Sequence, residues 1–100
     1  MVLEVKTKPG KRDQIRAAWD QYLRPQLEDP DSAQSLYLVC EAAGDTDTLL
    51  LIEMYDDPSR MEANASAPWF QDYMAEAAPL LDGQPRMILG TPVWAKGVAV

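Results

Sequence analysis

Residues 35 to 55 read SLYLVCEAAGDTDTLLLIEMY, two apolar runs on either side of a short polar segment. The runs cover residues 35 to 42 and 48 to 55, and each has the length of a strand bounded by turn-forming residues. Gly44 and the neighbouring aspartates suit the dihedral angles of a tight connection. The sequence therefore predicts an antiparallel hairpin.

The second run of this hairpin is apolar on both of its faces as far as Glu53. Side chains alternate between the two faces of a strand. The two rows are Leu49, Leu51, Glu53 and Tyr55 on one face and Leu50, Ile52 and Met54 on the other. A strand that is apolar on both sides is expected to be covered on both sides. One cover is expected to be the protein's own helices, and the other a second subunit.

Another strand and a helix precede the hairpin. Residues 2 to 7 alternate as a strand does, and the turn KPGK ends it. A helical stripe follows at spacings of three and four. It consists of Ile15, Ala18, Trp19, Tyr22 and Leu23. Pro25 is expected to end or kink this helix.

The segment after the hairpin predicts a pair of helices and a last strand. Asp57 and Pro58 form a helix start, and Pro68 begins a second helix, which Pro79 limits. The apolar stripe of that helix is Phe70, Tyr73, Met74, Ala77 and Leu81. Residues 86 to 97 predict a strand that Gly90 and Pro92 interrupt, features that fit an edge, a bend or an arm crossing to a partner.

The order strand, helix, strand, strand, helix pair, strand is the split βαβ arrangement of a ferredoxin-like α+β domain. We expect one domain over residues 1–100, with a four-stranded antiparallel sheet and helices on one face. The other face would stay apolar and open. Pairing of two sheets in a homodimer would close it.

The composition excludes several classes of partner. The formal charge of −7 repels nucleic acid and anionic membranes, and no segment approaches the roughly 20 apolar residues of a membrane helix. The first residues lack a signal-peptide core, so the cytoplasm is the expected location. Cys40, the one cysteine, lies inside a predicted strand and is interpreted as a small buried hydrophobe.

The sequence contains no histidine, which removes serine–histidine and cysteine–histidine dyads, histidine-rich metal sites and the usual haem ligand. Carboxylates alone could hold magnesium. The aspartate pairs at residues 45 and 47 and at residues 56 and 57, however, lie in predicted turns. We therefore expect neither a metal nor another cofactor.

Residues 52 to 81, IEMYDDPSRMEANASAPWFQDYMAEAAPLL, carry a resemblance to a known family. They contain a strand ending in Glu-x-aromatic, an acidic turn, a short helix and a second helix that starts with Pro-aromatic-Phe. This pattern resembles the antibiotic biosynthesis monooxygenase superfamily of dimeric α/β barrels. Residues 5 to 19, VKTKPGKRDQIRAAW, resemble the strand, Pro-Gly turn and first helix of the same family.

The resemblance implies a homodimer whose two sheets meet, with a mainly apolar pocket in each subunit for a small apolar or aromatic molecule. The activities attached to this fold include cofactor-independent oxygenation of quinol-like or anthrone-like aromatics, haem degradation, isomerisation of a small signal molecule and, in larger relatives, chlorite chemistry. The fold alone does not choose among these activities.

Departures from the family pattern narrow the choice. Many members have a histidine at the position of Asn64, and haem-degrading members have their axial histidine at the position aligned with Met74. The anthrone-oxidising branch has Asn and Trp where this chain has Leu51 and Tyr55. These departures therefore disfavour haem as a ligand. The Asn and Trp of the anthrone-oxidising branch are missing.

Strand alternation and the resemblance together indicate where a site would lie. The candidate catalytic residues are Glu53, Tyr55 and Asn64. A carboxylate among apolar side chains has a raised pKa and can act as a base, while a tyrosine can donate to a substrate oxygen or simply cap the core. The candidate substrate-binding residues are Leu51, Trp69, Tyr73 and Arg86.

Glu53 and Arg86 also have structural alternatives, as do Asn64, which could be an ordinary amide on a helix surface, and Trp69, which could belong to the core. Glu53 could pair with Arg86, with Lys6 or with a backbone N–H near the edge of the sheet. Arg86 could also be an edge residue that only prevents association of strands.

Three functions stay open from the sequence. The first is a cofactor-independent monooxygenase acting on a quinol-like or polyketide-type aromatic, with Glu53 or Tyr55 starting proton removal. The second is a dimeric pocket protein that binds or isomerises a small carbonyl compound without oxygen chemistry. The third is a structural or regulatory dimer whose pocket has filled with side chains.

Overall fold

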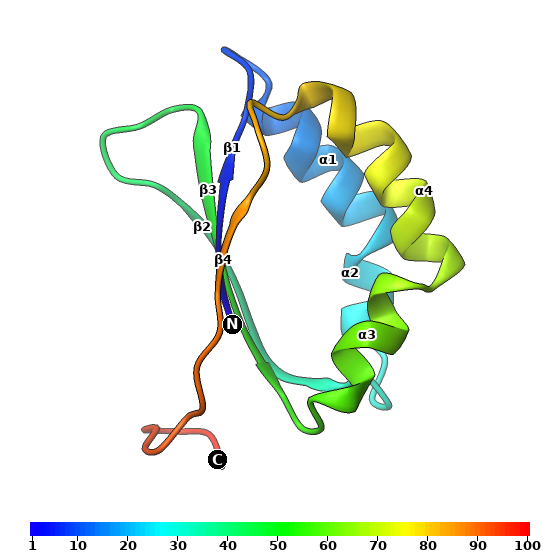
Figure 1. Ribbon diagram of the computed structural model, residues 1–100, viewed down its shortest axis with the longest axis vertical. Helices are drawn as coiled ribbons and strands as arrows, with labels where there is room; N and C mark the ends of the chain where they lie inside the picture. The colour runs from blue at the N-terminus through cyan, green and yellow to red at the C-terminus, as the bar shows by residue number, and fades with distance from the viewer.

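Figure 1 shows the computed structural model, which describes residues 1–100, as one antiparallel sheet with the helices on a single face. The strand order is β2-β3-β1-β4, so the predicted ferredoxin-like α+β topology is confirmed. The elements in chain order are β1 (Val2–Lys6), α1 (Arg12–Tyr22), α2 (Arg24–Leu27), β2 (Gln34–Glu41), β3 (Thr48–Tyr55), α3 (Ser59–Ala65), α4 (Pro68–Ala77), the 3₁₀ turn η1 (Ala78–Leu80) and β4 (Arg86–Ile88).

The core lies between the sheet and the helices. Val5 of β1 and Leu49 and Leu51 of β3 pack against Ile15 of α1, and none of the four is more than 6% exposed. A second cluster joins α1 to α4, and its buried members are Ala18, Leu23, Tyr73 and Ala77. The helical stripes predicted from the sequence therefore face the sheet and each other, as their periodicity requires.

Prolines set the boundaries of the helices. Pro25 stands in the first turn of α2, so the predicted kink separates α1 from α2. Pro68 begins α4 and Pro79 lies in η1. Leu81, predicted on the stripe of α4, instead follows η1 and pairs with Thr7 in an isolated bridge. None of the helices has the length and the apolar run that a membrane span requires.

The last strand is shorter than predicted. It covers Arg86–Ile88, and residues 89 to 100 continue as an irregular tail, orange to red in Figure 1. The predicted interruptions, Gly90 and Pro92, lie in this tail, and proline cannot donate to a strand ladder. Val93 and Trp94 of the tail are exposed. The predicted strand over residues 86 to 97 is therefore correct only for its first three residues.

The face of the sheet away from the helices is apolar and open. The strand register aligns Leu38, Ile52, Val2 and Ile88 in one row across all four strands. Leu38, Val2 and Ile88 are between 42% and 51% exposed. The helices thus cover one face of β3, and the second cover expected from its sequence does not come from this chain.

Ile15→Ala is expected to lower the free energy of unfolding by about 2–5 kcal/mol, because it leaves a cavity where α1 meets the sheet. Urea denaturation followed by circular dichroism measures the change. Val93→Ala, in the exposed tail, is the control and should stay within about 0.5 kcal/mol of the parent protein. Equal losses in the two variants would contradict the position given to the core.

Candidate functional site

Glu53 is a buried carboxylate near the end of β3. It is 7% exposed and lies two residues after Leu51, on the face of the sheet that carries the helices. The four ion pairs of the protein do not include it. Arg86 aligns with Glu4 across the β1–β4 ladder and so lies on the opposite face. The alternative of an ion pair between Glu53 and Arg86 is therefore excluded.

Both hydrogen bonds to the Glu53 side chain reach the same oxygen. Gln34 Nε2 donates to Glu53 Oε1 at 3.4 Å, and the Tyr55 hydroxyl donates to it at 3.2 Å. Glu53 Oε2 accepts no hydrogen bond within the protein. Arg12 Nε is the one fully buried side-chain nitrogen or oxygen that lacks a partner, so Oε2 is not fully buried. Oε2 is therefore the oxygen that solvent or a ligand can reach.

The surroundings of this carboxylate shift its protonation. Burial raises the pKa of Glu53, and the hydrogen bonds from Gln34 and Tyr55 and the charge of the N-terminal amino group oppose the rise. Burial, together with the Glu53 charge, also raises the pKa of Tyr55 to about 12. At neutral pH Tyr55 is thus a neutral donor beside a carboxylate that holds a proton more readily than an exposed one.

Two further tyrosines enclose this part of the core. Tyr37 of β2 is the cross-strand neighbour of Glu53, and its hydroxyl accepts a hydrogen bond from Trp19 Nε1 at 3.3 Å. Burial and the Glu53 charge raise the pKa of Tyr37. Burial raises the pKa of Tyr73 to about 12. These tyrosines are neutral at physiological pH. Glu53 is therefore the buried group here that gains or loses a proton at a pH below the physiological one.

Two hollows are each lined by members of the cluster formed by Gln34, Glu53, Tyr55 and Asn64. The larger has a volume of about 330 Å³, and Glu53 and Tyr55 line it together with Met54, Pro58, Met61 and Leu89. The smaller has a volume of about 130 Å³, and its lining includes Gln34, Asn64 and Trp69. Since a cavity of about 150 Å³ holds benzene, the larger pocket has room for a substituted or fused aromatic molecule.

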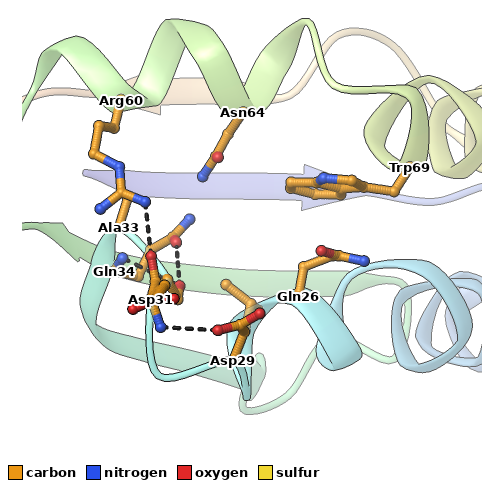
Figure 2. Close-up of a pocket in the computed structure, with 10 residues that line it drawn as sticks. Gln26, Asp29, Asp31, Ala33, Gln34, Arg60, Asn64 and Trp69 are labelled. Carbon is orange, nitrogen blue, oxygen red and sulfur yellow. Dashed lines mark hydrogen bonds between the residues drawn. The ribbon is translucent and has the colours of Figure 1, made fainter.

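Figure 2 shows the smaller pocket, which is mostly polar. The Asn64 side chain extends from α3 toward β2, between Arg60 and the flat ring of Trp69. Arg60 Nη2 donates to the Asp31 carbonyl oxygen at 2.7 Å. Hydrogen bonding from Asn64 also limits the rise in the pKa of Tyr55. Asn64 therefore connects the small pocket to the carboxylate cluster.

The structure brings some of the predicted site residues together and separates others. Glu53, Tyr55 and Asn64 form one cluster, and Trp69 lies on the wall of the small pocket. Leu51 and Tyr73 belong to the two packed core clusters rather than to a pocket wall. Arg86 lies across the sheet from all of them. No group of three His, Cys, Asp or Glu side chains is arranged to hold a metal ion.

Gln34 is a member of the cluster that the sequence pattern does not predict. Strict alternation from Tyr37 and Val39 would place residue 34 on the open face of the sheet. A β-bulge between Gln34 and Leu36 adds one residue to β2 and returns Gln34 to the helix face, opposite Tyr55. The hydrophobic pattern of the strand contains no signal for this bulge.

Comparisons with known proteins bear on the fold. No protein-family model matches the sequence, and no curated protein matches it. A Nitrosomonas europaea protein, named as a candidate antibiotic biosynthesis monooxygenase, has a TM-score of 0.81 and 12% identity over 93% of this chain and 96% of its own. A Chloroflexus aurantiacus protein with the same kind of name has a TM-score of 0.76 and 24% identity over 98% and 95%.

A protein from Mycobacterium tuberculosis has a TM-score of 0.77 and 22% identity, over 95% of this chain and 95% of its own. These similarities extend over nearly the whole chain in each case. The protein therefore has the ferredoxin-like fold of structures named as antibiotic biosynthesis monooxygenases, and the resemblance seen in the sequence is confirmed at the level of the fold.

Glu53→Gln is expected to stabilise the protein increasingly as the pH rises. Because the pKa of Glu53 is raised on folding, the folded state keeps a proton that the unfolded chain releases. The contribution of Glu53 to stability is thus complete at pH values below 4.5, the ordinary pKa of a glutamate side chain. This contribution is lost as the pH rises through the raised pKa. The amide keeps an acceptor for both donors but has no charge to bury.

Urea midpoints of the parent and variant proteins between about pH 4 and pH 8 measure this effect. The difference between them should grow with pH and then level off. Glu62→Gln, which removes an exposed carboxylate from α3, is the matched control and should give a flat difference. A flat difference for Glu53→Gln as well would show that burial does not raise the pKa of this carboxyl.

Proposed function

We propose that the protein is a member of the antibiotic biosynthesis monooxygenase superfamily and oxygenates a quinol-like or polyketide-type aromatic without a cofactor. One observation carries the proposal: Glu53, buried and engaged in no ion pair, offers an unpartnered oxygen beside a pocket of about 330 Å³. The names of the structures with the same fold support this reaction class. The open pocket also argues against the third function, which requires a filled one.

The substrate itself supplies the electrons in this reaction. Glu53 Oε2 takes a proton from an activated C–H or phenolic O–H of the substrate, and the resulting anion transfers one electron to O₂. The two radicals join in a C–O bond to form a peroxide. At a CH₂ carbon, the peroxide anion takes back the proton from Glu53. Its O–O bond then breaks as the second C–H proton leaves, which gives a carbonyl and water. The substrate carbon gives up four electrons, one oxygen atom of O₂ enters the product and the other leaves in the water, and Glu53 is again a carboxylate.

Tyr55 and the pocket wall have separate roles in this scheme. The Tyr55 hydroxyl is neutral at the working pH and can donate to the oxyanion that develops on the substrate. The Asn64 amide of α3 limits the rise in the pKa of that hydroxyl. The apolar wall, with Met54, Met61 and Leu89, limits water around the anion and so strengthens each of these interactions.

We also propose that two copies of the chain pair through the open face of their sheets. The exposed row of Leu38, Val2 and Ile88 supports this proposal, because apolar side chains that cross a whole sheet are typical of an interface. The helices lie on the other side and would not obstruct the contact (Figure 1). Glu53 and Tyr55 would remain on the helix face of each subunit.

Purified protein is expected to consume oxygen with hydroquinones or anthrones in the presence of a chelator and without flavin. Glu53→Gln should lower kcat/KM by about 10²- to 10⁴-fold, because the general base is lost. Tyr55→Phe should lower it by a smaller factor, and Glu62→Gln should leave it unchanged. An oxygen electrode measures the rates. Binding of these aromatics without oxygen uptake would instead favour a pocket protein that performs no oxygen chemistry.

Leu38→Arg is expected to convert the dimer into monomers, because it places a charge in the middle of the apolar row. Light scattering after size-exclusion chromatography measures the molar mass. Ala17→Arg, on the exposed side of α1, is the matched control and should remain dimeric. A parent protein that is monomeric at all concentrations would refute the pairing.

A further inference from the structure

Ser32 holds the Gln34 side chain in one orientation. The Gln34 backbone N–H donates to Ser32 Oγ at 3.3 Å, and the Ser32 hydroxyl donates to Gln34 Oε1 at 2.9 Å. Because the side-chain oxygen of Gln34 faces this hydroxyl, its NH₂ group faces the other way, toward Glu53 Oε1. Ser32, two residues before the start of β2, therefore decides which end of the amide meets the carboxylate.

We propose that Gln34 is a positioning residue for Glu53: with Tyr55 it occupies Oε1, and it thereby leaves Oε2 as the oxygen that exchanges a proton in the larger pocket. The effect of Gln34 on catalysis rests on the proposed function. The hydrogen-bond contact itself does not, since it belongs to the fold whatever the pocket binds.

This arrangement suits both protonation states of Glu53. When the carboxyl is ionised, Gln34 and Tyr55 stabilise its charge at Oε1. When it is protonated at Oε2, Oε1 remains an acceptor and both donors keep their partner. At 3.4 Å and 3.2 Å the two contacts are long, and they can shorten when a substrate binds to the ionised site. A proton can thus enter and leave without rearrangement of the site.

Apart from Tyr55, the charged or titratable groups around Glu53 make no hydrogen bond to its side chain. They are Tyr37 of β2, Tyr73 of α4 and the amino group of Met1 beside β1. The pKa of each of the three tyrosines is raised, so none of them ionises in the acidic or neutral range. The Met1 amino group donates to the Glu53 backbone carbonyl, and not to its side chain. Gln34 and Tyr55 are therefore the direct contacts of the carboxylate itself.

The test follows the Glu53 carboxyl by ¹³C NMR in the full chain, with its signal assigned from the loss in Glu53→Gln. Gln34→Leu keeps most of the side-chain volume and removes the donor. Ser32→Ala keeps Gln34 and removes the hydroxyl that orients it. Gln71→Leu is the matched control, because Gln71 donates to the Ala65 carbonyl on the surface of α4 and lies outside both pockets.

Gln34→Leu is expected to move the titration midpoint of Glu53 to higher pH, because a donor that stabilises the carboxylate is lost. Ser32→Ala should move it in the same direction by less, and Gln71→Leu should not move it. In the oxygen assay, Gln34→Leu should shift the acidic limb of the kcat/KM profile the same way and lower kcat/KM by about ten- to a hundredfold.

The two readouts separate this inference from the proposed function. A shifted NMR midpoint in Gln34→Leu would support the positioning role even if the parent protein consumed no oxygen. An unshifted midpoint in a folded variant would overturn it, even if the parent protein were an active oxygenase. If Gln34→Leu does not fold, Ser32→Ala decides in the same way, by whether its midpoint moves.

Discussion

The central constraint in this protein is that β3 is apolar on both faces as far as Glu53. The carboxylate of Glu53 then lines the larger pocket. Leu49 and Leu51 are buried under α1, and Ile52 aligns with the open row on the other side. Pairing with both β1 and β2 fixes β3 at the centre, so neither face can turn to solvent without breaking a ladder. The same alternation that buries Leu51 carries Glu53 to the helix face two residues later.

Much of this arrangement can be predicted from the sequence because it depends on periodicity. The hairpin, the stripes of α1 and α4, and the proline boundaries follow from local patterns that the tertiary structure leaves intact. The positions of Glu53 and Tyr55 on the helix face follow for the same reason. Asn64 is different, because its place beside Tyr55 depends on how α3 packs, and the sequence indicated it only through the resemblance to a family.

What the sequence could not predict depends on register. The face on which Arg86 lies is decided by its alignment with Glu4, which no local pattern reveals. The bulge in β2 reverses the facing of Gln34 relative to the rest of the strand, so a strict period of two misplaces that residue. The tail after Ile88 has the composition of a strand, but it has no neighbouring strand within this chain to pair with.

The burial of Glu53 is the strongest structural argument that this cluster has a role beyond packing. A carboxylate that is 7% exposed and in no ion pair reduces stability when it is ionised, whereas a glutamine would satisfy the same two donors without that loss. A direct ion pair would have kept the charge buried at less cost, but it would also have lowered the pKa further and weakened the carboxylate as a base. Neutral donors on one oxygen leave the other free, which is the arrangement that suits proton exchange with a bound molecule.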